Sequence, residues 1–373
     1  MSNKRLLFIQ DDPLLGNIYR DRLEMAGFAV ETARSGEAGL RMAQEMQPDA
    51  VVVDPILEAE DISDSIARIR ATRPAPQMPI LLLPTVHAPL VNHAQKAGAT
   101  RMIERSANPL ASIVAEVSAA VGLGADASAP ASEDALAPQW QQAALNAIPA
   151  SLTSLRQALH EVLHNPAAGP HWRELLRRTH SLAGQLALLG ENPMSHLASA
   201  LEVLVYGLEC YPERINPLTL RTLGQAVDFL ATLWEKEAHT QPLDLQHSQV
   251  LIVEDEAGAR ELIIAAMQLV GLNADGLETP GASLAVLSTH PCDLIFLDVN
   301  LPEMNGFEVC TKIRAFSLHE RTPIIFLTGM TSFHNRVQSS LSGGNDFVGK
   351  PFNVAELGVK ALIWLLKGRL GLN

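Results

Sequence analysis

The sequence lacks several features that mark whole classes of protein. It contains no arginine- or lysine-rich run, and its formal net charge at pH 7 is −13. Binding to a nucleic-acid backbone needs a basic face that neutralises phosphates, so we expect no nucleic-acid partner. No apolar run reaches the roughly 18 residues that indicate a membrane-spanning helix, so we also expect no membrane insertion.

Cysteine is also scarce, and its spacing does not match a metal site. The three cysteines, Cys210, Cys292 and Cys310, are typical of reduced thiols in a cytoplasmic protein. The first stretch, "MSNKRLLFIQDD", reaches acidic residues too early for a signal peptide. We therefore expect a cytoplasmic location.

The sequence does contain an internal repeat within a globular composition. Its 373 residues, 47% hydrophobic and 18% charged, are enough for two or three domains. The stretches that start at Arg5 and at Gln249 both predict a short apolar strand, acidic residues, an amphipathic helix and a closing glycine. Four landmark pairs share a separation of 244 positions: Asp11 with Asp255, Gly27 with Gly271, Asp54 with Asp298, and Pro79 with Pro323. This constant separation indicates an internal duplication.

The predicted fold class is α/β plus all-α. In residues 248–373 the apolar stretches "VLIVE", "LIFLD", "PIIFLT" and "DFVGK" alternate with helix-length segments, which is typical of a parallel sheet covered on both faces. Residues 1–122 repeat this pattern, and residues 123–138, rich in Ala, Ser and Pro, predict a flexible linker. Residues 139–240 are helical with three breaks. We expect two doubly wound, flavodoxin-like domains that flank a four-helix bundle.

Polar residues of the second copy fall at the ends of its predicted strands. Because the carboxyl ends of parallel strands meet at one edge of a sheet, these residues are expected to form one site. They are Glu254, Asp255, Asp298, Thr328 and Lys350. Together with "FLDVNLPEMNGFEV", "PIIFLTG" and "DFVGKPF", they make residues 248–373 resemble a two-component receiver domain over their full length.

The residue types of this site suit phosphoryl transfer. The Asp298 carboxylate is the expected nucleophile, which takes the phosphoryl group as an acyl phosphate. Lys350 supplies positive charge for the phosphoryl oxygens. Mg²⁺ prefers oxygen ligands, and the expected ligands are Asp255 and Asp298 directly, Glu254 through water, and Asn300 through its backbone carbonyl. The resemblance also implies that Thr328 bonds the phosphoryl group and that Phe347 changes rotamer with it.

The first copy keeps the frame of this site but not its full chemistry. Asp11 and Asp54 remain as the residues of a degenerate site. Four other positions of the site differ between the copies. Gln10 corresponds to Glu254, Pro84 to Thr328, Arg105 to Lys350 and Met102 to Phe347. Proline has no hydroxyl to bond a phosphoryl group, and arginine is not an equivalent point charge. Either Asp54 still accepts a phosphoryl group slowly, or this copy is a docking or dimerisation module. The second hypothesis is favoured.

One histidine of the helical region has an unusual setting. In "RTHSLAGQLALLG", residues 178–190, a glycine inside a helix costs about 1 kcal/mol relative to alanine and asks for a reason. Helical periodicity places Arg173, Arg177, His180, Gly184 and Ala187 on one stripe, and Leu175, Thr179, Leu182, Leu186 and Leu189 on an apolar face. His180 is therefore expected to point outward, with small neighbours that let a partner domain approach.

This stretch resembles the motif of histidine-containing phosphotransfer domains, four-helix bundles in which one exposed histidine carries phosphoryl groups between receivers. His180, Leu182, Gly184 and Gly190 match the motif. Ala183 departs from it, since the family commonly has lysine there. The resemblance implies that His180 is a phosphorylation site.

These features favour a phosphorelay protein that moves phosphoryl groups between His180 and Asp298. No ATP-binding glycine-rich box is present, so we expect no kinase activity and an external phosphoryl donor. The expected partners are a sensor histidine kinase and other receiver or phosphotransfer proteins, with homodimerisation through receiver faces. One alternative is the regulatory front of an output enzyme such as a diguanylate cyclase, because "ELGVKALIWLLKGRLGLN" resembles a last receiver helix that runs outward. The other is a scaffold in which neither site turns over.

Overall fold

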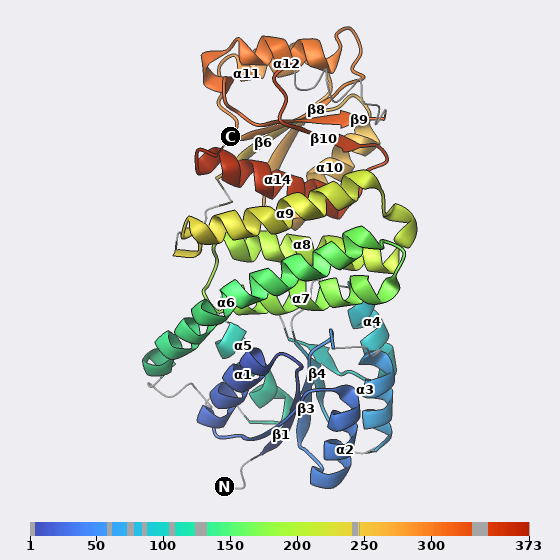
Figure 1. The fold of residues 1–373 in the computed structure, drawn as a ribbon, viewed down its shortest axis with the longest axis vertical. Helices are drawn as coiled ribbons and strands as arrows, with labels where there is room; N and C mark the ends of the chain where they lie inside the picture. The colour runs from blue at the N-terminus through green and yellow to red at the C-terminus, as the bar shows by residue number, and fades with distance from the viewer. Residues whose placement is uncertain are drawn as a thin grey trace. The chain divides into compact units, whose positions relative to one another are not determined.

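The computed structural model describes residues 4–57, 62–72, 78–83, 88–103, 109–123, 133–240, 245, 247–329 and 342–372. Figure 1 shows the order of the elements along the chain. The chain divides into two units, residues 1–209 and 210–373, each of which is described by itself.

The first unit begins with an α/β domain, residues 4–123, called here the N-terminal domain. Its strands are β1 (Arg5–Ile9), β2 (Ala29–Ala33), β3 (Ala50–Val53), β4 (Ile80–Leu82) and β5 (Arg101–Met102). Its helices are α1 (Pro13–Met25), α2 (Gly36–Met46), α3 (Ile62–Ala71), α4 (Ala88–Ala97) and α5 (Pro109–Ala120). The strands are parallel in the order β2-β1-β3-β4-β5, with α1 and α5 packed on one face of the sheet and α2, α3 and α4 on the other.

The second unit contains the other α/β domain, residues 247–372, called here the C-terminal domain. Its strands are β6 (Gln249–Val253), β7 (Asn273–Leu277), β8 (Leu294–Asp298), β9 (Ile324–Thr328) and β10 (Asp346–Gly349). Its helices include α10 (Ala257–Leu269), α11 (Pro280–Leu287), α12 (Gly306–Arg314) and α14 (Val354–Arg369). The strand order β10-β9-β8-β6-β7 is that of the first sheet counted from its other edge. The two predicted doubly wound parallel sheets are therefore confirmed.

A pair of arginines shows that the duplication extends to side-chain contacts. Arg70 in the N-terminal domain and Arg314 in the C-terminal domain are separated by the same 244 positions as the landmark pairs. Arg70 Nη2 donates to the carbonyl of Gly98 at 2.7 Å, and Arg314 Nη2 donates to the carbonyl of Gly343 at 2.7 Å. In both copies the guanidinium thus ties the third helix of the domain to the turn before its last strand.

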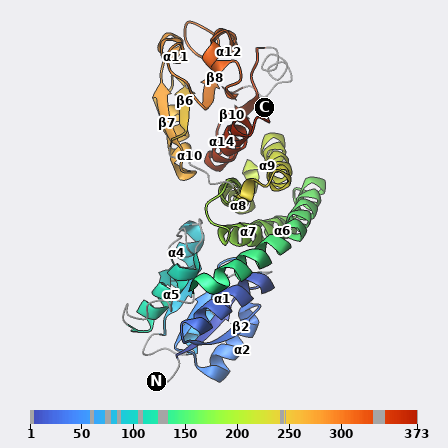
Figure 2. The ribbon, with the colours of Figure 1, turned by 90° about the vertical axis from the view of Figure 1, so that its left-hand side faces the viewer.

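Helices fill the middle of the chain: α6 (Glu133–His164), α7 (Gly169–Ala187), α8 (Pro193–Cys210) and α9 (Pro217–Glu235). The three predicted breaks are confirmed, but α6 begins at Glu133, inside the predicted linker, and it continues through Pro138 and Pro149. In the first unit α6 packs along α7, and in the second α9 packs along α14 (Figures 1 and 2). The four-helix bundle stays a prediction. None of the described helices combines the length and apolar character that a membrane crossing requires.

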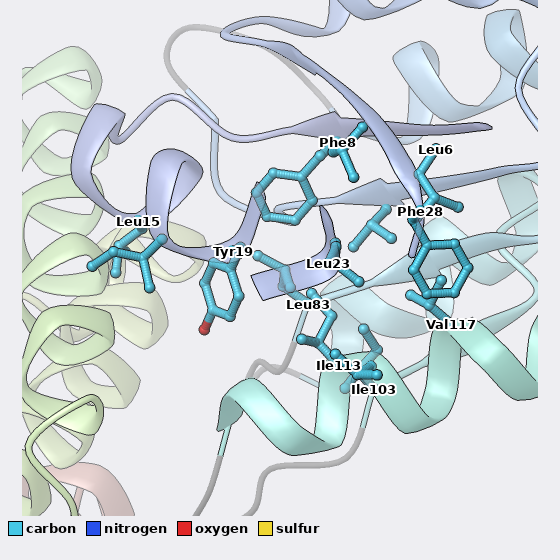
Figure 3. Packing of buried hydrophobic residues seen from close by; sticks show 14 of the residues in the cluster. Leu6, Phe8, Leu15, Tyr19, Leu23, Phe28, Leu83, Ile103, Ile113 and Val117 are labelled. Atoms are coloured by element: carbon cyan, nitrogen blue, oxygen red, sulfur yellow. The ribbon is translucent and has the colours of Figure 1, made fainter. Parts of the chain in front are cut away.

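One apolar core joins the N-terminal domain to α6 and to the end of α7. Figure 3 shows the part of this core that lies between the sheet and helices α1 and α5, with Phe8, Tyr19 and Leu23 near its centre. Trp140 and Ala144 of α6 and Leu188, the residue that follows α7, belong to the same cluster of buried residues. Burial of such a continuous apolar surface favours the docked arrangement of the first unit.

Candidate functional site

Three carboxylates gather at the strand ends of the C-terminal domain. Glu254 and Asp255 follow β6, and Asp298 is the last residue of the neighbouring strand β8. One ligand oxygen from each residue lies within 4.8 Å of the others, and Glu254 and Asp298 are buried. An all-oxygen donor set of this kind suits a hard divalent cation such as Mg²⁺.

Lys350 lies against these carboxylates. Its Nζ is 2.8 Å from a carboxylate oxygen of Glu254 and 2.9 Å from Oδ2 of Asp298. Burial lowers the pKa of Lys350, but its bonds to the two carboxylates outweigh this effect and raise the pKa overall. Burial and the charge of Asp298 raise the pKa of Glu254, against the effect of the ammonium. With three ionised carboxylates and one ammonium the cluster carries a net charge of −2, which one divalent cation neutralises.

The other predicted residues of this site lie at or beside the same sheet edge. Thr328 is the buried last residue of β9, and its carbonyl accepts the backbone N–H of Lys350 at 2.8 Å. The backbone N–H of Asn300 donates to Oδ1 of Asp298 at 3.2 Å. Phe347 lies in β10 with its ring buried, and the guanidinium carbon of Arg221 is 5.3 Å from the ring centroid. The structure thus brings the predicted acceptor, metal-binding and phosphoryl-binding residues together.

The loop after β8 depends on Gly306. A Cβ atom at this position would lie 2.1 Å from the backbone carbonyl oxygen of Asp298, which is far closer than real Cβ atoms approach. The backbone N–H of Gly306 also donates to the carbonyl of Val299 at 3.0 Å. The loop that holds Asp298 therefore needs glycine here, whereas the first copy has Ile62 at the corresponding position.

The strand ends of the N-terminal domain have a different set of contacts. Asp54 follows β3 and is buried, and Gln10 Nε2 donates to its Oδ2 at 2.5 Å. The other Asp54 oxygen, Oδ1, accepts the backbone N–H of Ile56 at 2.7 Å. Burial and the charge of Asp54 raise the pKa of Asp11. The amide of Gln10 thus contacts Asp54, whereas the corresponding residue of the second copy, Glu254, is an acid. Met102 ends β5, while the predicted replacements Pro84 and Arg105 lie outside the described residues.

His180 of α7 lies between two carboxylates of the first unit. Its Nδ1 is 2.9 Å from Oε1 of Glu202 on α8, and its Nε2 is 3.2 Å from the carboxylate of Asp54. Its side chain is only 14% exposed. His180 thus lies on the side of α7 that a partner domain was expected to approach, and the N-terminal domain covers it there. Burial lowers the pKa of His180, but the charges of Asp54 and Glu202 outweigh this and hold the pKa well above its ordinary value.

Arg177, His180 and Gly184 of the predicted stripe on α7 meet the N-terminal domain. Arg177 Nη1 is 3.2 Å from Oδ2 of Asp11. Ser181 Oγ donates to the carboxylate of Asp12, and so does Gln185 Nε2, at 3.1 Å. A Cβ atom on Gly184 would lie 2.8 Å from Cδ1 of Leu15 on α1. The glycine that seemed costly in a helix therefore admits Leu15.

Most of the predicted apolar face of α7 is confirmed, since Leu175, Thr179, Leu182 and Leu186 are buried. Leu189, also predicted on this face, lies beyond the end of α7 and is partly buried. Glu202 was not predicted, although it is fully buried on α8. Its signal in the sequence is a single acid within the apolar stretch "LASALEVLV", which asks for a cationic partner.

Comparison with known proteins places these features in a family. The family described as "Response regulator receiver domain" matches residues 6–115 and 250–361, which together exceed half of the chain. A similar curated protein is the probable transcriptional regulator ycf27 of Cyanidium caldarium, 36% identical over 112 residues, or 30% of this chain and 43% of that protein. Another is the phosphate regulon transcriptional regulatory protein PhoB of Pseudomonas aeruginosa, 35% identical over 29% of this chain and 47% of that protein. The chain thus spans less than half the length of these relatives.

Solved structures give matches of domain size. The chemotaxis protein CheY4 of Vibrio cholerae is 31% identical and covers 31% of this chain and 95% of its own, with a TM-score of 0.30. The receiver domain of the sensor histidine kinase PA1611 from Pseudomonas aeruginosa PAO1, described with magnesium in its active-site cleft, is 28% identical. That match covers 32% of this chain and 97% of the other, with a TM-score of 0.30.

Proposed function

The chain belongs to the response regulator receiver domain family, and we propose that Asp298 is its phosphoryl acceptor in two-component signalling. The observation that carries this proposal is the contact of Lys350 Nζ with both Asp298 and Glu254, beside Asp255. An acceptor carboxylate, further oxygen ligands and a fixed cation are the parts that phosphoryl transfer to a carboxylate needs.

The proposed reaction is a displacement at phosphorus. A carboxylate oxygen of Asp298 forms the new P–O bond, the bond from phosphorus to the donor group breaks, and the donor leaves with the electron pair. The product is an acyl phosphate, which water hydrolyses to restore the carboxylate. The Lys350 ammonium balances the negative charge of the phosphoryl oxygens, and the Thr328 hydroxyl bonds one of them.

Magnesium fits the residues that are present. The three clustered carboxylates offer oxygen atoms only, and the net charge of −2 around Lys350 matches one divalent cation. We propose Glu254, Asp255 and Asp298 as the residues that hold it, together with the carbonyl of Asn300. When bound, Mg²⁺ neutralises charge on the phosphoryl oxygens.

His180 is proposed as a second phosphoryl carrier, in a phosphotransfer helix of a phosphorelay. Its support is its place on the stripe of α7 and its resemblance to the phosphotransfer motif. Phosphoryl groups would reach the chain from a sensor histidine kinase, or pass to and from other receiver or phosphotransfer proteins. The chain itself then acts as an acceptor and carrier rather than as a kinase.

The experiment that tests this function is labelling of the purified chain with radioactive acetyl phosphate in the presence of Mg²⁺. We expect label that is lost in alkali, as acyl phosphates are, and its absence in Asp298→Ala. Asp54→Ala is the matched control in the other copy and should keep the label. If Asp298→Ala takes up as much alkali-labile label as the wild type, Asp298 is not the phosphoryl acceptor.

A further inference from the structure

The acidic residues at the strand ends of the N-terminal domain, Asp11, Asp12 and Asp54, contact side chains of α7 in the same chain. We propose that this domain is a cap that binds the face of α7 around His180 and keeps Nε2 from phosphoryl transfer until the cap leaves. This proposal concerns the regulation of His180 and rests on its proposed role as a phosphoryl carrier. The proposal is argued from the contacts of α7 with two segments of the N-terminal domain. These segments are the start of α1, with the residues just before it, and the residue that follows β3.

The hydrogen bonds of the ring show why the capped histidine is a poor nucleophile. Ionised carboxylates only accept hydrogen bonds, so each ring nitrogen must donate one, Nδ1 to Glu202 and Nε2 to Asp54. An imidazole that donates from both nitrogens is an imidazolium and has no free lone pair. In the capped state neither nitrogen is therefore able to attack phosphorus.

Space and charge exclude a phosphoryl group from Nε2 in the same state. The Asp54 carboxylate lies 3.2 Å from Nε2, and its side chain is only 1% exposed. A phosphoryl group on Nε2 would occupy the place of this carboxylate and would carry the same sign of charge. Phosphorylated His180 and the closed cap are therefore mutually exclusive.

The charges of the cap complement those of α7. In the C-terminal domain the ammonium of Lys350 pairs with Asp298, whereas Asp54 of the N-terminal domain pairs with the imidazolium of His180 on α7. The guanidinium of Arg177 pairs in the same way with Asp11 at 3.2 Å. Two cations of the helix thus pair with two of the acids of the cap, Asp11 and Asp54.

The shape of the two surfaces supports the same partner. Asp12 links the two elements: its Oδ1 accepts the backbone N–H groups of Leu14 and Leu15 at the start of α1, and its Oδ2 accepts Ser181 and Gln185. This arrangement fixes the first turn of α1 against α7. Leu15 then fills the space that Gly184 leaves, and a larger residue there would collide with it.

The test measures how fast diethyl pyrocarbonate modifies His180 in the full chain, site by site, through peptide mass spectrometry. The reagent attacks neutral, accessible imidazole, and exposed His164 serves as the internal reference. Leu15→Arg opens the cap by bulk and charge, and Asn17→Arg places the same residue on an exposed position of α1 as the matched control. Asp54→Ala removes the partner of Nε2, so the test survives if Leu15→Arg does not fold.

We expect His180 of the wild type to react more slowly than His164 by about tenfold or more, which corresponds to about 1.4 kcal/mol. Leu15→Arg and Asp54→Ala should remove most of this protection, and Asn17→Arg should keep it. A wild-type His180 that reacts as fast as His164, or protection that persists in both opening variants, would overturn the cap.

A parallel incubation with phosphoramidate separates the cap from the proposed function. In this reaction Nε2 attacks phosphorus and ammonia leaves, so the product is an acid-labile phosphohistidine. If the opening variants gain both pyrocarbonate reactivity and phosphohistidine at position 180, cap and function both hold. Reactivity without phosphohistidine would support the cap while it contradicts the carrier role of His180.

Discussion

Removal of the cation in the acceptor site should strengthen magnesium binding. Lys350→Met leaves the three carboxylates of the cluster without their ammonium, so their net charge falls from −2 to −3. Two unit charges about 4 Å apart interact by about 4 kcal/mol at an effective dielectric constant of about 20. Mg²⁺ carries two charges, so its repulsion by the ammonium at this distance doubles to about 8 kcal/mol, which is the upper limit of the gain in the variant.

Solvent reduces that limit, because the Lys350 side chain is 23% exposed. We expect the dissociation constant for Mg²⁺ to fall by roughly ten- to thirtyfold, or about 1–2 kcal/mol. Isothermal titration calorimetry at about pH 8 suits the measurement, because burial raises the pKa of Glu254 and a proton on it would compete with the metal. The same variant should accept phosphoryl groups more slowly, since the ammonium no longer balances the charge that arrives.

Lys312→Met, on an exposed position of α12, is the matched control and should leave the affinity for Mg²⁺ unchanged. Asp255→Asn should weaken binding in both backgrounds. Equal or weaker Mg²⁺ binding by Lys350→Met would mean that the ammonium does not compete with a cation for these carboxylates.

The remaining predictions concern stability and the acceptor loop. The pKa of His180 in the folded chain is raised above 6.5. Its ion pairs therefore stabilise the first unit fully below about pH 6.5, and progressively less as the pH rises through the folded pKa. Calorimetry should show this loss of stability in the wild type and not in His180→Gln. Lys360→Met leaves the buried carboxylate of Asp346 without its 2.6 Å partner and should cost about 3–5 kcal/mol in chemical denaturation, whereas adding Asp346→Asn should recover much of it. Gly306→Ala should slow labelling by acetyl phosphate by about tenfold or more, or about 1.4 kcal/mol, while Gly258→Ala, whose added Cβ meets nothing within 4 Å, should not; equal rates in the two variants would contradict the role given to the loop.

The sheets and the acceptor site could be predicted because their signals are local and repeated. Continuous apolar strands, helix-length spacers and a constant separation of 244 positions determine the two α/β domains. Since parallel strands end at one sheet edge, the topology alone brings Asp255, Asp298 and Lys350 together. The structure brings these residues together, with Lys350 Nζ 2.9 Å from Oδ2 of Asp298.

The surroundings of His180 could not be predicted in the same way. Asp54 lies 126 positions before His180, and Asp11 lies 166 positions before Arg177, so no periodic pattern connects them. The sequence gives only a hint, an unexplained Gly184 inside a helix, which indicates a close approach without identifying what approaches. Periodicity places Arg177 on the stripe of α7 but does not identify its partner, Asp11 of the N-terminal domain.

The start of α6 shows a limit of composition as a signal. Residues 123–138 were predicted as a linker from their Ala, Ser and Pro content, yet α6 begins at Glu133 and includes Pro138. Pro138 is the sixth residue of α6, beyond the first turn, so its ring removes one hydrogen bond of the helix without ending it. Pro149, further along, is accommodated in the same helix.

The two copies share a fold, and we infer that only the second keeps the acceptor chemistry. The most direct measurement is reductive trapping: the chain is incubated with acetyl phosphate and Mg²⁺, treated with borohydride, which converts aspartyl phosphate into homoserine, and mapped by peptide mass spectrometry. We expect homoserine at position 298 and unmodified aspartate at position 54. Homoserine at position 54, or none at position 298, would contradict this inference.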